Sequence, residues 1–185
     1  MKTNVMPYRL REAGPADVSG ARSVMLDTFY RVFDVGYRPD WHADVIDLEG
    51  TYLRPRHHAL FVAEHEGEIV ATTAVRAAAP NSPPHPRWLV DRYPADTTAQ
   101  LFRVYVRPEH RRQGLARSLV REAVSFASDQ PIYRAIYLHT DTRVAGAEAF
   151  WRTMAELVHD PRDGGSGCSQ TVHFEIPIER QACRS

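Results

Sequence analysis

The chain has 185 residues, a length typical of one globular domain. Its 43% hydrophobic and 25% charged residues are ordinary for such a domain and exclude a disordered or collagen-like chain. Lys plus Arg and Asp plus Glu balance at 23 each, so the overall charge provides no attraction to nucleic acid or to an anionic membrane. We therefore expect a single domain over residues 1–185, with neither nucleic acid nor membrane as a partner.

The sequence also argues against export and against a metal site. The first seven residues contain no apolar signal segment, so we expect a cytoplasmic protein. Cys168 and Cys183 form neither a disulfide framework nor a zinc pattern. His57-His58 and the run Trp41-His42-Ala43-Asp44 have no third ligand at a suitable spacing, and we expect solvated histidines there rather than a metal.

The first half of the sequence predicts a strand, two helices and a hairpin. The strand covers Tyr8–Arg11. Apolar residues then recur at intervals of three or four, which places them on one face of a helix: Val18, Ala21, Met25, Phe29 and Val32. A shorter helix is expected at Trp41–Tyr52. Ala59–Glu64 and Ile69–Val75, joined by a glycine-containing turn, form an antiparallel hairpin.

Prolines dominate the middle of the chain, and the second half alternates strands with helices. Five prolines from Pro80 to Pro94 predict a long irregular loop, because proline removes backbone donors and interrupts helices. The elements expected after it are a strand at Leu101–Val106, a helix from Gly114 to about Ser128, a strand at Ala135–His139, a helix at Arg143–Met154, a hairpin tip at Gly164–Gly167 and a strand at Thr171–Ile178. This order predicts an α/β fold of the α+β type, in which helices flank a mixed, largely antiparallel sheet.

The segment from Val104 to Ala116 carries the main functional signal. A strand runs into a basic loop that opens a helix, and Gly114 and Ala116 keep large side chains away from the first helical turn. Unpaired N–H groups at a helix start bind phosphate oxygens. Residues 101–121 contain six arginines and one acidic residue, so we expect a polyanionic ligand.

At this point the sequence resembles the GCN5-related N-acetyltransferases (GNAT). The pyrophosphate loop of that family reads R/Q-x-x-G-x-G/A after a strand that ends V-x-P, and here Arg111-x-x-Gly114-x-Ala116 follows Val106-Arg107-Pro108. A second family region, a strand followed by a helix with A-x-x-[LF]-Y, is matched by Tyr137–Thr140 and Ala147–Trp151. The resemblance covers residues 101–157 and implies the GNAT-like acyltransferase fold.

The resemblance also implies an activity and a set of contacts. The chain would move an acetyl group from acetyl-CoA, as co-substrate, to a primary amine of a small molecule or peptide by direct attack, without a metal. The pyrophosphate would lie on the amides of Arg112–Ala116, and the thioester beside Val104–Val106. The cofactor-binding residues implied in this way are Val104, Tyr105, Val106, Arg111, Arg112, Gln113, Gly114, Leu115, Ala116, Arg117, Thr140 and Phe150.

The general base is less clear from the sequence. Gln100 stands where many family members carry a glutamate, and an amide cannot accept the proton. His139, at the end of the strand expected to flank the thioester, is our first candidate, because an unperturbed histidine pKa of about 6.5 suits base catalysis near neutral pH. Asp141 and Glu64 are weaker alternatives.

The general acid is equally open. Trp151 occupies the place of the tyrosine that protonates the CoA thiolate in many family members, and an indole cannot supply that proton. Tyr105 is a candidate substitute, with simple packing between strand and helix as the alternative. The departures at Gln100 and Trp151 keep a second hypothesis open, a non-catalytic module that binds or senses acyl-CoA. Nucleic-acid binding through the arginines of Arg103–Arg121 is a weaker third hypothesis.

Charge gives a hypothesis about the acceptor. Residues 34–49 contain five acidic side chains and a single arginine, so a cationic amine would be attracted to them. An acidic face that is merely solvated is the alternative, and Arg87 and Arg92 would instead favour a carboxylate. Trp88 and Tyr93 could supply apolar walls. The sequence does not identify the acceptor or the oligomeric state, and a homodimer is compatible with it.

Overall fold

The computed structural model describes residues 8–164 and 170–178. Cys168, Cys183 and most of the predicted hairpin tip at Gly164–Gly167 lie outside the described residues. The chain divides into two compact units, Met1–Arg76 with Phe102–Ala123 and Ala77–Leu101 with Val124–Ser185. We call them the first and the second unit.

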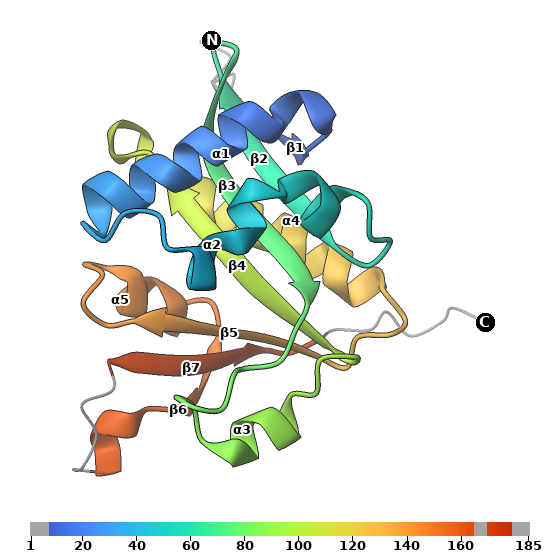
Figure 1. Ribbon diagram of the computed structural model, residues 1–185, viewed down its shortest axis with the longest axis vertical. Helices are drawn as coiled ribbons and strands as arrows, with labels where there is room; N and C mark the ends of the chain where they lie inside the picture. Colours follow the sequence, from blue (N-terminus) through green and yellow to red (C-terminus); the bar gives the residue numbers. More distant parts are fainter. Residues whose placement is uncertain (1–7, 165–169, 179–185) are drawn as a thin grey trace, which may run out of the picture. The chain divides into compact units, whose positions relative to one another are not determined.

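Seven strands, labelled in Figure 1, hydrogen-bond in the order β1-β2-β3-β4-β5-β7-β6. Their bounds are Arg9–Glu12, Ala59–His65, Glu68–Ala77, Thr98–Val106, Ala135–Asp141, Glu156–His159 and Thr171–Ile176 for β1 to β7. The pairs β1–β2, β2–β3, β5–β7 and β6–β7 are antiparallel, whereas β4–β5 is parallel. The predicted mixed, largely antiparallel sheet is therefore confirmed.

The first unit buries its apolar side chains between helices and the β2–β3 hairpin. Helix α1 (Val18–Asp27) continues into a π-helical turn at Thr28–Val32, as the apolar spacing predicted. Figure 1 shows α1 and α2 (Pro39–Ile46) over the same face of β2 and β3. The cluster between them is buried and includes Ala21, Val24, Met25, Phe29, Val45, Tyr52, Leu60, Val62 and Ala74.

The single helix expected at Trp41–Tyr52 is two pieces, α2 and a helical turn at Glu49–Leu53. Asp47 separates them with a non-helical backbone, and its Oδ1 accepts the Gly50 N–H at 2.8 Å. Aspartate favours such breaks because its side chain competes for backbone donors.

The prediction of an irregular loop over Pro80–Pro94 is wrong for its second part. Helix α3 (Arg87–Arg92) begins directly after Pro86, in a stretch without proline, and its Leu89 is fully buried. The apolar anchor and the i,i+4 pair between Arg87 and Asp91 (3.1 Å) favour the helix locally.

The remaining elements of the second half follow the predicted order. Helix α4 (Leu115–Asp129) buries the predicted face of Leu115, Leu119, Val120, Ala123 and Ala127. Helix α5 is shorter than expected, at Ala147–Arg152, because Gly146 precedes it in a left-handed conformation (φ 79°). Among the described helices, none is both long and apolar enough to cross a membrane.

Candidate acyl-CoA site and a histidine cluster

The loop between β4 and α4 has the backbone expected of a phosphate-binding loop. Arg112 and Gly114 both adopt left-handed conformations, with φ of 63° and 78°. A Cβ added to Gly114 would meet no atom within 4 Å, so the space in front of this residue is open. Ser118 N–H donates to Gly114 O at 3.0 Å, and this bond begins the helical hydrogen-bond pattern of α4. The predicted loop therefore leads into the start of α4 through two left-handed residues, with open space at Gly114.

Four of the six arginines between positions 101 and 121 fall into two groups. Arg103 is paired with Asp44, and Arg107 is bound to Asp27 and to Ser23 Oγ. Both side chains are therefore bound to groups of the protein itself. Arg111 and Arg112 are exposed, with Arg111 Nε donating to Val106 O at 3.1 Å, so they are the arginines placed to reach a ligand on the loop.

Strand β4 carries a local irregularity directly before the predicted thioester-binding segment, Val104–Val106. Arg103 has φ 52°, a left-handed conformation that is rare for a residue with a side chain. Two contacts hold it: Thr72 Oγ1 donates to Arg103 O at 2.7 Å, and the Arg103 guanidinium forms a buried ion pair with Asp44 at 2.5 Å. Parallel pairing of β4 with β5 covers only Thr98–Gln100, although β4 continues to Val106.

Tyr105 packs as an aromatic wall in the first unit. Its ring meets those of Phe29 and Phe33 edge to face, at 6.0 and 5.6 Å, and Arg103 Nη1 donates to its hydroxyl oxygen at 3.4 Å. Burial raises the pKa of Tyr105, with the Arg103 charge opposing the shift. Tyr105 therefore releases a proton less readily than an ordinary tyrosine, and the packing role is the one visible in its contacts.

The structure corrects the roles expected for Asp44 and His42. Asp44 is buried, and its carboxylate accepts from Arg103 and from the Tyr52 hydroxyl (2.6 Å). Asp44 is therefore not available to attract a cationic acceptor. His42 is not a solvated histidine: it is buried, stacks on Phe29 at 3.8 Å, and its Nδ1 accepts the Arg38 N–H at 2.9 Å. Removal from water lowers the pKa of His42.

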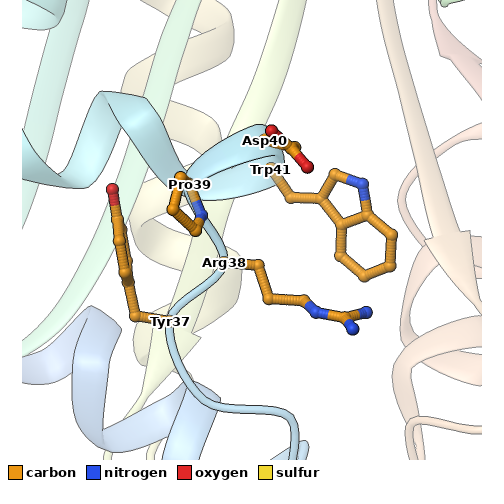
Figure 2. Close-up of a pocket in the computed structure, with 5 residues that line it drawn as sticks. All are labelled: Tyr37, Arg38, Pro39, Asp40 and Trp41. Carbon is orange, nitrogen blue, oxygen red and sulfur yellow. The ribbon is translucent and has the colours of Figure 1, made fainter.

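A surface hollow of about 370 Å³ lies at the start of α2 (Figure 2). It is lined by consecutive residues of one segment: Tyr37, Arg38, Pro39, Asp40 and Trp41. The Arg38 guanidinium stacks on the exposed indole of Trp41 at 4.7 Å, while Tyr37 points to the other side of the segment. Asp40 is exposed, so it is the carboxylate of the acidic segment that remains accessible at this hollow.

The second unit contains a cluster of histidines that the sequence analysis did not foresee. His139 of β5 lies opposite His173 of β7 in the strand register, with ring centroids 6.0 Å apart. His85 packs against both rings, at 5.1 and 4.7 Å, and His159 stacks on His173 at 5.6 Å. The Tyr137 hydroxyl bonds His173 Nδ1 at 2.7 Å. Strand alternation is the signal that could have found this face, because residues 137, 139 and 173 point to one side of the β5–β7 pair.

His139 is held neutral by its surroundings. His139 is exposed at the strand surface, but the groups packed around its ring displace water from it, and together with the charge of His85 they lower its pKa to about 4. Its Nδ1 lies 3.4 Å from both the Tyr137 hydroxyl and Gln100 Nε2. The ionisation that we expected near neutral pH is therefore displaced to acid pH. His139 can accept a proton at any physiological pH, but it is a weaker base than free imidazole.

The alternatives to His139 are engaged elsewhere. Glu64 is paired with Arg11 at 2.7 Å, and Asp141 with Arg143 at 2.5 Å. The hydrogen bonds from Arg143 lower the pKa of Asp141, which makes it a weaker base. Gln100 is buried, and its Oε1 has no hydrogen-bond partner among the described residues.

The remaining predicted cofactor residues belong to the second unit. Thr140 is half-buried on β5 opposite Val172, and Phe150 is half-buried on α5. Trp151 is buried, with its ring 4.9 Å from that of Phe150. In the part of the chain that the structure describes, no group of three or more His, Cys, Asp or Glu side chains is arranged to hold a metal ion, the histidine cluster included.

Several solved structures that superpose on this chain are acetyltransferases. An acetyltransferase of the GNAT family from Staphylococcus aureus superposes with a TM-score of 0.68 at 15% identity, over 93% of this chain and 99% of that one. A protein from Salmonella typhimurium, solved with its cofactor acetyl-CoA, superposes with a TM-score of 0.65 at 13% identity, over 96% and 98% of the two chains. At these identities the comparison establishes the fold.

The family follows from the sequence match. The acetyltransferase (GNAT) family matches residues 25–155, which is most of the chain, and the protein belongs to this family. Among curated proteins, N-acetyltransferase 8 of Rattus norvegicus is 36% identical over 113 residues, covering 61% of this chain and 46% of that protein. The Homo sapiens protein of the same name is 35% identical over 111 residues, covering 60% and 44%. The chain thus spans less than half the length of these relatives.

Proposed function

We propose that the protein is an acetyl-CoA-dependent N-acetyltransferase that acts on a primary amine of a small molecule or peptide, and that residues 1–185 form one domain. The observation that carries the proposal is the loop before α4. Arg112 and Gly114 are left-handed, and the space at Gly114 is open beside the start of α4, which suits a pyrophosphate. The names of the relatives and of the solved structures support the same reaction class.

In this proposal the chain's own residues bind and orient the donor. The loop amides and the exposed Arg111 and Arg112 hold the phosphates, and a backbone amide of Val104–Val106 donates to the thioester oxygen as charge develops on it. The amine nitrogen forms the new C–N bond, the C–S bond breaks, and the thiolate takes up a proton from water. The amine proton passes to His139, directly or through water.

The test is thiol release from acetyl-CoA with a panel of amines, measured beside equilibrium binding of acetyl-CoA. We expect turnover with at least one amine, and an acetylated product with the corresponding mass increase. Tight binding without turnover on any amine would contradict the enzyme and support a non-catalytic acyl-CoA-binding module instead. Absence of binding would contradict both.

A further inference from the structure

Arg76 is the last residue but one of β3, and part of its guanidinium is buried without a partner in the described part of the protein. Its buried Nε atom has no hydrogen-bond partner there, and no ion pair joins it to an acidic residue within 4.0 Å in those residues. Buried donors are almost always paired, so an orphan of this kind needs a partner that the chain itself does not supply.

The position of Arg76 is fixed by its neighbours. It lies two residues after Ala74, which belongs to the core beneath α1, so strand alternation places Arg76 on the same face of β3. Its guanidinium stacks on the Phe102 ring at 4.2 Å. The side chain is half-buried, and the ring orients the planar group without using its N–H donors.

Asp44, the carboxylate on which the charge of Arg76 acts, is already occupied by other partners. Burial alone would raise the pKa of Asp44, but the hydrogen bonds and charge of Arg103, the Tyr52 hydroxyl and the charge of Arg76 together lower it. Asp44 already accepts two bonds from Arg103 and one from Tyr52. This cluster therefore contains two guanidinium groups and one carboxylate, and keeps an excess positive charge.

We propose that Arg76 binds a carboxylate of the acceptor, so that the preferred acceptors are amino acids or related amines that carry a carboxylate. An arginine fork matches a carboxylate with two parallel hydrogen bonds, and such charged bonds are strong where water is partly excluded. This inference rests on the proposed acetyltransferase function. It also replaces the cationic acceptor that the acidic segment suggested.

The test compares kcat/KM for phenylalanine and for phenylalaninamide in the wild type, Arg76→Gln and Arg76→Lys. Each amine is compared with itself across the variants, so the different pKa values of the two amines cancel. We expect Arg76→Gln to lower kcat/KM for phenylalanine by about 10- to 100-fold, the usual consequence of removing a hydrogen bond to a charged group, and to leave phenylalaninamide unchanged. Arg76→Lys, which keeps the charge but loses the fork, should fall between.

Arg56→Gln is the matched control, because Arg56 is exposed and lies outside this cluster. It should change neither rate. Equal losses for both amines in Arg76→Gln would overturn the proposal. A loss of acetyl-CoA affinity that accounts for the rate loss would assign the anion to a cofactor phosphate and would also overturn it.

Failure of the proposed function is distinguishable from failure of this inference. If the wild type acetylates no amine, binding of N-acetylphenylalanine and of N-acetylphenylalaninamide is measured by calorimetry in the presence of CoA. A preference for the free acid that Arg76→Gln removes would support the carboxylate site without turnover. Equal binding of the two compounds, or none, would overturn it.

Discussion

Acid should unfold this protein through His173, whose side chain is almost fully buried. Loss of water, followed by the charges of His85, His139 and His159, lowers the pKa of His173 to about 3, and Asp160 opposes the shift only weakly. The ring is thus neutral in the folded protein. In the unfolded chain the same residue takes up a proton below its ordinary pKa of about 6.5.

The sign and size of the effect follow from linkage. Between pH 6.5 and about 3 the unfolded state binds the extra proton, so the free energy of unfolding falls as the pH falls through this window. Above pH 6.5 the contribution of His173 to stability is complete. With these two pKa values, His173 alone should remove about 2 kcal/mol between pH 7 and pH 5.

The assay is chemical denaturation of the wild type and of His173→Gln at pH 7, 6 and 5. Glutamine can retain a hydrogen bond to Tyr137 but does not titrate, so the variant should lose about 2 kcal/mol less than the wild type over this range. His110→Gln, outside the cluster, is the matched control and should follow the wild type. Identical pH dependence in the wild type and His173→Gln would show that His173 does not destabilise the folded protein in acid.

Three further outcomes are expected. Asp44→Asn should lower the free energy of unfolding by about 3 to 5 kcal/mol in denaturant titrations, because Arg103 would remain buried without its counter-charge. A loss of less than about 1 kcal/mol, which is typical of exposed ion pairs, would contradict a buried ion pair. His139→Ala should lower turnover, and the pH profile of the wild-type rate should show no ionisation of His139 near neutrality, since the pKa of His139 is about 4; full turnover in the variant would favour a water relay. Trp151→Phe should leave turnover little changed if the indole is only a buried wall, and a large loss of kcat would give Trp151 a catalytic part.

Local signals in the sequence predicted much of the fold. The four-residue spacing of Ala21, Met25 and Phe29 required only that a helix bury one face. Gly114 marked the start of α4 because the loop needs a left-handed residue there. Helix α3 was missed because the prolines around it hid a short segment whose helical form depends on burying Leu89.

The side-chain networks were less accessible because they depend on distant parts of the chain. Arg103 and Asp44 are 59 positions apart, and Tyr137 and His173 are 36 apart. At such separations, a single sequence contains no periodic spacing that would indicate a contact between the two residues of either pair. For the same reason, the shifted pKa of His139 and the unpartnered Nε of Arg76 emerged only from the structure.

If the loop before α4 binds the phosphates of acetyl-CoA, a branched side chain at position 114 should abolish that binding, which calorimetric titration of acetyl-CoA into Gly114→Val measures. Gly67→Val is the matched control: Gly67 is also left-handed (φ 85°) and also faces open space, but it lies in the β2–β3 turn. Each substitution strains its own backbone, while only that at Gly114 places methyl groups where the phosphates would lie. We predict that folded Gly114→Val loses acetyl-CoA binding and that Gly67→Val retains it. Wild-type affinity in folded Gly114→Val would contradict the account.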